Sequence, residues 1–171
     1  GKTTFEWGNL NHKSNNQISI SPMYYGKLSK RFQLRHGGGP SVSFSNNYNY
    51  VNTVLANAKV QRYGVNYGLQ RSTTKGLDFG IELSPGYLIQ DNSIGAMEDS
   101  KGFTFSSEGN LKYFLPAKFI VRADFSYSYQ APTAVYSKKF ERFVLSPALS
   151  KKLLKDEKLE LTFRANALLK Q

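Results

Sequence analysis

The stretch 119–131, FIVRADFSYSYQA, alternates between two kinds of side chain. Every second residue from Phe119 to Tyr129 is apolar or aromatic, and the residues between them are mostly charged or hydroxyl-bearing. A period of two residues is typical of a β-strand whose two faces have different surroundings. The fold therefore depends on what covers the apolar face, which is either a protein core or lipid.

The same alternation recurs along the chain, and no stretch fits helical spacing better. It is clearest in residues 76–90 and 159–169. We expect nine antiparallel strands, near residues 3–10, 16–26, 31–50, 58–71, 76–90, 102–115, 119–131, 142–154 and 159–170. Several reach 12 or more residues, whereas globular strands average about 5–6 and membrane-spanning strands need roughly 9–11.

The links between these strands alternate in length. Short links are expected at 27–30, 72–75, 116–118 and 155–158, and longer ones at 52–58, 91–101 and 131–141. One end of the sheet then carries tight turns and the other carries loops, as in up-and-down outer-membrane barrels. Pro22, Pro85 and Pro147 fall inside strand patterns, where only a bulge or an edge position tolerates proline.

Composition narrows the class of partner. The chain has 171 residues, 40% of them hydrophobic, a net charge of +11 and no cysteine, so disulfides and thiolate metal sites are excluded. Its cations cluster in turns and at strand ends, which favours anionic lipid headgroups over nucleic acid. No apolar run approaches the roughly 18 residues of a membrane helix, and the first residues lack the features of a signal peptide.

Strand length, turn alternation and mixed charge on the polar faces predict an all-β, antiparallel up-and-down transmembrane β-barrel. We expect residues 1–171 to form one barrel region, with no plug domain or signal peptide visible in the sequence. Aromatic residues near strand ends suit interfacial girdles, although tyrosine also favours strands in general. The charged residues expected to face the lumen are Arg62, Asp78, Glu82, Glu108, Lys112, Arg122, Asp124, Arg142, Glu160 and Arg164.

The alternative is a soluble all-β binding module of lectin-like or jelly-roll type. In such a module the apolar faces of two sheets pack against each other. Phe79 and Phe125 would then be buried among apolar side chains.

The segment 143–171 resembles the late strands of the outer-membrane β-barrel family related to TonB-dependent receptors. The resemblance rests on Ser150-Lys151-Lys152, on the polar link 155–158 and on Asn166-Ala167-Leu168. The hairpin YYGKLSKRFQL at 24–34 is similar to hairpins of that family. Members are much longer, with a plug and about twenty or more strands, so we expect a segment of a larger barrel. A complete barrel of eight strands is the alternative.

The resemblance implies a role in the outer membrane of a Gram-negative cell, in solute uptake or as a scaffold in an outer-membrane complex. Outer-membrane lipid and lipopolysaccharide are the implied partners, together with other outer-membrane or periplasmic proteins. Nucleic acid is not among the expected partners.

Enzymatic chemistry finds little support in the residues. His12 and His36 have no second ligand at a useful spacing, and HGGG at 36–39 lacks the G-x-S-x-G partner motif of a lipase. We read these glycines as a distorted strand or bulge. The acidic stretch 91–100 lacks the calcium-loop pattern, and an outer-membrane hydrolase needs a histidine–carboxylate cluster that cannot be assembled. We expect no catalytic residue, no metal and no cofactor.

Overall fold

A computed structural model of the chain describes residues 13–51, 54–93, 99–134, 137–153, 158–166 and 169–170. These residues form ten β-strands and one 3₁₀ turn, η1 (Pro116–Lys118), and they include no α-helix. The predicted all-β class is therefore confirmed. The predicted strand 3–10 lies outside the described residues.

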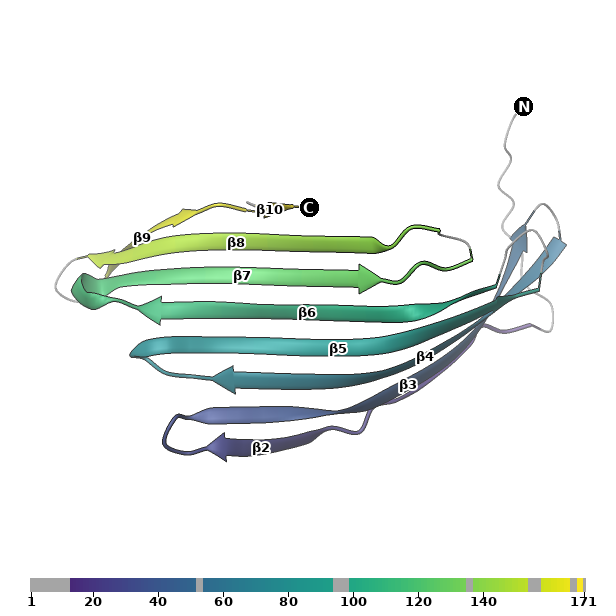
Figure 1. Cartoon of the computed structure of the whole chain (residues 1–171), viewed down its shortest axis with the longest axis horizontal. Coiled ribbons are helices and arrows are strands. Elements are labelled where there is room, and N and C mark those ends of the chain that lie inside the picture. The colour runs from purple at the N-terminus through teal and green to yellow at the C-terminus, as the bar shows by residue number, and fades with distance from the viewer. Residues whose placement is uncertain are drawn as a thin grey trace, which may run out of the picture.

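All ten strands join one antiparallel sheet (Figure 1). The strands are β1 (Asn16–Ile20), β2 (Tyr24–Ser29), β3 (Leu34–Val51), β4 (Val54–Arg71), β5 (Gly76–Asn92), β6 (Ser100–Phe114), β7 (Phe119–Gln130), β8 (Phe140–Leu153), β9 (Leu159–Arg164) and β10 (Leu169–Lys170). From β3 to β8, neighbours in sequence are neighbours in space. The predicted up-and-down order is confirmed for this part of the sheet.

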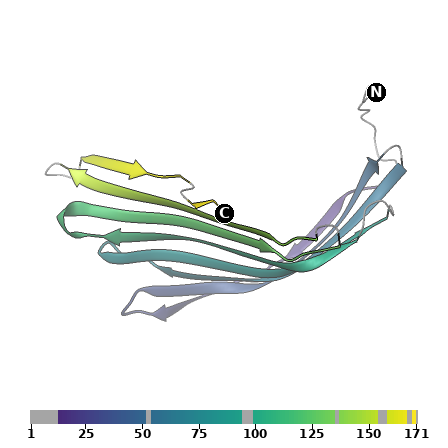
Figure 2. The ribbon, with the colours of Figure 1, turned by 45° about the horizontal axis from the view of Figure 1, so that its top comes forward.

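The sheet is a single open layer. Strands β1 and β2 both pair with β3, and β9 and β10 both pair with β8, so the ten strands fill 10 − 2 = 8 positions. Among the described residues the two outer edges do not pair with each other. Figure 2 shows that the sheet is curved and twisted rather than flat. The closed barrel itself therefore stays a prediction.

The ends of the sheet follow the predicted turn pattern, with one correction. The short turns 30–33, 72–75 and 115–118 connect strands at one end, drawn at the left of Figure 1, and the C-terminal ends of β5 and β7 lie at the other. The predicted loop 52–58 is wrong, because β4 begins at Val54. Residues 54–58 continue the ladder opposite residues 47–51, so they belong to a strand.

Three prolines lie where the ladder is interrupted. Pro22 falls between β1 and β2. On the outer side of β8, Pro147 lies opposite the break between β9 and β10, where its carbonyl accepts a hydrogen bond from the Ala165 amide. Pro85 pairs with Phe105 of β6 but has no recorded partner on β4. Breaks of this kind divide the predicted strands 16–26 and 159–170 in two, because proline offers no amide donor.

The glycines of the HGGG segment allow close backbone approach rather than a bulge. The β3–β4 register runs through Gly37, Gly38 and Gly39 without a shift. A Cβ atom at Gly38 would overlap the carbonyl oxygen of Asn66. One at Gly39 would overlap the carbonyl oxygen of Pro22. The predicted bulge is therefore wrong at this place.

Replacing Gly38 with alanine should destabilise the protein, because the obstructing atoms belong to the backbone of β4 and cannot rotate away. The expected cost is about 1–3 kcal/mol, as for other overpacked sites. Gly68→Ala is the matched control, since the nearest atoms to a Cβ there lie 3.8 Å away. Urea unfolding in detergent micelles measures both, and equal stability of the two variants would contradict this account.

Candidate functional site

The register divides the sheet into two faces with different chemistry. Side chains directly opposite each other on paired antiparallel strands share a face. The apolar face carries Leu83, Leu111 and Val121. The polar face carries the residues that directly precede and follow them in the sequence. All the predicted charged residues lie together on the polar face: Arg62, Asp78, Glu82, Glu108, Lys112, Arg122, Asp124, Arg142, Glu160 and Arg164.

In the part of the chain that the structure describes, no other protein element covers the apolar face. Among the described residues only Gly37, Ala56, Ile120, Ala148 and Ser150 are buried, and all five belong to the polar face. Ile81 is 37% exposed, Phe103 is 44% exposed and Phe163 is 76% exposed. In the described part of the chain no second layer packs against this face.

Aromatic side chains form a belt across the apolar face, near the end that carries the longer links. The belt consists of Phe44, Tyr63, Tyr87, Phe103, Phe105, Tyr127, Tyr129 and Phe143. Ring centroids lie 5.9 Å apart for Phe44–Tyr63, 6.3 Å for Phe103–Tyr129 and 5.9 Å for Phe105–Tyr127. These contacts link neighbouring strands side by side.

Charged side chains frame the apolar face at both ends. At the tight-turn end they are Arg71 and Lys151. At the other end they are Lys59, Asp91, Lys101 and Glu141. On the described strands no charged side chain of this face lies between the two sets. The apolar face is therefore a band with polar limits.

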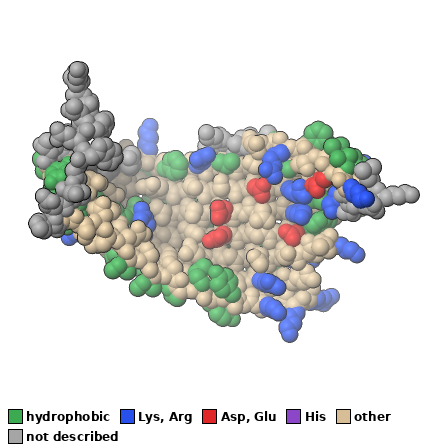
Figure 3. Space-filling view, turned by 180° about the vertical axis from the view of Figure 1, so that it is seen from behind, with side chains coloured by type: hydrophobic (Ala, Val, Ile, Leu, Met, Phe, Trp, Pro, Cys, Tyr) green, Lys and Arg blue, Asp and Glu red, His purple; other side chains and the backbone are tan. Residues whose placement is uncertain are grey.

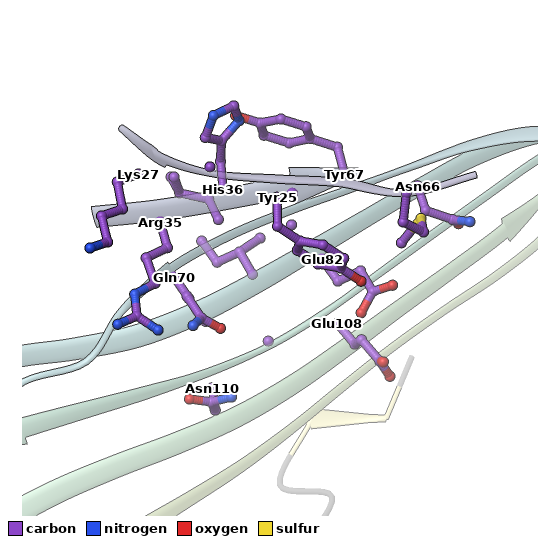
Figure 4. Close-up of a pocket in the computed structure, with 18 of the residues that line it drawn as sticks. Tyr25, Lys27, Arg35, His36, Asn66, Tyr67, Gln70, Glu82, Glu108 and Asn110 are labelled. Carbon is purple, nitrogen blue, oxygen red and sulfur yellow. The ribbon is translucent and has the colours of Figure 1, made fainter. Parts of the chain in front are cut away.

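The polar face contains a hollow of about 1060 Å³. Tyr25, Lys27 and Arg35 line one side of it, from β2 and β3, and Glu82 and Glu108 line the other, from β5 and β6. Figure 4 shows Tyr25, Glu82 and Glu108 on one side of the sheet and His36 and Tyr67 on the opposite side. The sequence prediction missed the β2 and β3 residues, because glycines 37–39 interrupt the alternation that assigns side chains to faces.

Three carboxylates, those of Glu82, Glu108 and Asp124, line the hollow of the polar face, and Figure 3 shows acidic side chains in the middle of this face. Glu82 lies directly opposite Glu108, and Asp124 lies opposite Asn110 on the next strand. In the described part of the chain none of the three joins an ion pair. Like charges placed opposite each other repel, so Glu82 and Glu108 do not stabilise the sheet as a cross-strand pair.

A polar cluster ties β7, β8 and β9 together on the same face. Arg122 donates to the Ser150 hydroxyl at 2.9 Å and pairs with Glu160 at 3.0 Å. The Ser150 and Thr162 hydroxyl oxygens lie 2.8 Å apart. Arg122 crosses β8 above its register partner Ala148, which is small enough to let the guanidinium pass. Ser150 is fully buried beneath the cluster.

The remaining titratable groups do not assemble into a reactive site. His36 lies on the apolar face, with the Tyr24 and Tyr67 rings 5.8 and 6.0 Å from its own ring. His12 lies outside the described residues. No group of three His, Asp or Glu side chains in the described ranges could hold a metal ion. In the link 131–139, a 2.6 Å hydrogen bond to Glu141 and the charge of that carboxylate raise the pKa of Lys139.

Comparison with known proteins adds no identification. No protein-family model, curated protein or solved structure matches the chain. None of the described residues belongs to a helix long and apolar enough to span a membrane. The family resemblance of residues 143–171 therefore stays a prediction.

Replacing Ser150 with alanine should cost about 1–2 kcal/mol of unfolding free energy, because Arg122 and Thr162 lose a buried hydrogen-bond partner. Ser126→Ala is the matched control, since Ser126 lies on the same face of β7 and is exposed. Its effect should stay within about 0.5 kcal/mol, as for an ordinary surface position. Denaturant titration in micelles gives both values, and a Ser150 variant as stable as the control contradicts a role for the cluster.

Proposed function

We propose that the chain is part of a transmembrane β-barrel in a Gram-negative outer membrane, similar to the family related to TonB-dependent receptors. It serves solute uptake, or it acts as a scaffold in an outer-membrane complex. The observation that carries this proposal is the uncovered apolar band with charged limits on both sides. Lipid covers such a band without a second layer of protein.

The strand stagger supports a barrel geometry. The row of paired residues that begins at Leu34 of β3 reaches Pro147 of β8. The last pair of β8 at the tight-turn end involves Leu153, which is 153 − 147 = 6 residues further along. From β3 to β8, which is five strand-to-strand steps, the tight-turn end of the sheet is therefore displaced by six residues along the strand direction.

This stagger corresponds to a definite strand tilt if the tight turns mark one membrane surface. With about 3.3 Å per residue and about 4.8 Å between strands, the tilt is about 40°. Strands of membrane barrels are tilted by about 35–45°. The register therefore favours a sheet built for closure around an axis.

The height of the apolar band agrees with the thickness of a bilayer. Lys59 and Arg71 limit it on β4, 71 − 59 = 12 residues apart, and Glu141 and Lys151 limit it on β8, 151 − 141 = 10 residues apart. At about 3.3 Å per residue and the tilt of about 40°, these spans are about 30 and 25 Å high. The apolar band of a membrane barrel is about 25 Å tall.

The aromatic belt lies at the level of an interface. Along their strands, Tyr63 and Tyr87 each lie four residues from the charged residue at the longer-link limit of the band. Phe103 and Phe143 each lie two residues from that limit. Amphipathic rings prefer the headgroup region at both limits of a barrel's apolar band. The belt thus supports lipid rather than protein as the neighbour of this face.

The polar face then lines the lumen, and its hollow forms part of the solute path. The unpaired carboxylates of Glu82, Glu108 and Asp124 face this space together. They give the path a negative middle section, which favours cations over anions. In the scaffold role the same face holds a partner instead of a moving solute.

The soluble binding module remains the second reading. It needs a second sheet to cover the apolar face, and the described residues supply only one. Phe79 and Phe125 are half-buried on that sheet. Nitroxide labels on residues 83 and 84 distinguish a membrane barrel from a soluble binding module.

Nitroxide labels on adjacent residues should report opposite surroundings in membranes. The chain contains no cysteine, so Leu83→Cys and Ser84→Cys each give a single attachment site. The label at residue 83 should relax faster with oxygen, which dissolves in lipid, and the label at residue 84 with a water-soluble nickel complex. Electron paramagnetic resonance measures both rates. A protein that is monomeric and folded without detergent or lipid would falsify the membrane proposal.

Neutralising the carboxylates should change ion selectivity. In planar bilayers, Glu82→Gln combined with Glu108→Gln should shift the reversal potential toward anions, because two negative charges leave the lumen. Glu141→Gln is the control, since that residue belongs to the apolar face. A folded, inserted protein with no conductance supports the scaffold role, and an unchanged reversal potential in a conducting protein contradicts the assignment of these carboxylates to the lumen.

A further inference from the structure

Charge is distributed unequally between the two ends of the sheet. At the tight-turn end, the turns and the limit of the apolar band carry Lys30, Arg31, Arg71, Lys75 and Lys151. We name these five residues the basic collar. The acidic residues described at this end are Asp78 and Glu160, and both belong to the polar face. At the tight-turn end, the charged side chains described next to the apolar band are therefore all cationic.

The other end of the apolar band has mixed charge. Lys59 is the direct register partner of Asp91. Glu141 there is bonded to Lys139 at 2.6 Å. Opposite charges thus partly compensate each other at this end. Its described charged residues outside the polar face are Lys13, Lys59, Lys101, Lys138 and Lys139 against Asp91, Asp99 and Glu141, a net charge of 5 − 3 = +2, compared with +5 for the basic collar. An anionic surface is therefore attracted more strongly to the tight-turn end than to the other.

Members of the collar are placed as interfacial anchors. The Lys151 ammonium lies 4.5 Å from the centre of the Phe119 ring, and the Arg31 guanidinium lies 5.5 Å from that of Phe32. Phe32 is 53% exposed in the turn before β3. A cation next to an exposed ring combines an apolar body with a charged tip, which suits the boundary between hydrocarbon and headgroups.

Arg71 provides an independent sign of a missing anion. Its Nε atom is buried and has no hydrogen-bond partner among the described residues. A buried donor without a partner is costly, and a phosphate oxygen is a natural acceptor for a guanidinium. Arg71 is also the limit of the apolar band on β4, where a lipid headgroup lies next to it.

We infer that the basic collar binds the phosphates of anionic phospholipid headgroups in the leaflet at the tight-turn end. The inference rests on the proposed membrane location. It specifies which class of lipid the protein binds and in which leaflet of the membrane. Phospholipid is the occupant because the collar is continuous with the apolar band, so one molecule places its chains on the band and its phosphate on Arg71 or Lys151. A soluble phosphate uses only half of this surface.

The test measures lipid selectivity at the protein surface. The protein is reconstituted in phosphatidylcholine vesicles with a trace of spin-labelled phosphatidylglycerol or spin-labelled phosphatidylcholine, and the fraction of immobilised label is compared. A basic residue attracts an anionic headgroup that lies next to it by about 1 kcal/mol, which is about a fivefold preference for that one lipid molecule. We expect wild type to prefer phosphatidylglycerol about fivefold at low salt, and Arg71→Gln with Lys151→Gln to lose at least half of that preference.

The matched control is Lys59→Gln with Lys101→Gln, which removes the same charge from the other end of the band. It should keep the wild-type preference. Equal losses in the two double variants overturn the inference, as does a wild type without preference. If inorganic phosphate abolishes the preference at constant ionic strength, while chloride does not, the collar is a site for free phosphate and the inference is also wrong.

The same samples separate this inference from the membrane proposal. Oxygen accessibility of a label at residue 83 shows insertion, and heat-modifiable gel mobility shows that each variant is folded. An inserted, folded protein without phosphatidylglycerol preference overturns the collar and leaves the proposed function intact. A protein whose residue 83 label never enters lipid overturns both.

Discussion

A single sheet with an uncovered apolar face depends on something other than protein to remove that face from water. Burial of apolar surface is the main favourable term in folding, and here only three apolar residues among those described are buried. The remaining apolar side chains of the sheet supply that term only when a partner covers them. The nature of this partner decides the stability, the location and the function together.

The sizes of the side chains agree with lipid on the apolar face and a lumen on the polar one. From β3 to β6, the polar face carries only small residues along the row Ser41, Gly64, Gly86 and Thr104, whereas the apolar face carries aromatic rings on the neighbouring rows. On a curved sheet, side chains converge inside the curve and diverge outside it. Small residues therefore suit the hollowed face, and large rings suit the opposite face, where they have room.

The sequence predicted most of the sheet because alternation is a local property. In 119–131 the polarity of each residue predicts which face of the sheet it lies on. The ten charged residues assigned in this way share one face in the structure. The prediction failed where the residues themselves do not indicate which face of the sheet they lie on. Gly37–Gly39 have no side chains to alternate, so Tyr25 and Arg35 at the hollow were missed. The pairing of Glu82 with Glu108 depends on register, which no single strand encodes.

The polar and apolar faces place their charges according to opposite rules, and this difference is informative. On the apolar face charge is confined to the two limits, and the middle is free of it on the described strands. On the polar face three carboxylates lie in the middle, without an ion pair in the described part of the chain. Unpaired carboxylates persist at low cost only in water. The proposed barrel accounts for both charge patterns at once, because the wall of a water-filled barrel has water on one side of the sheet and lipid on the other at the same level.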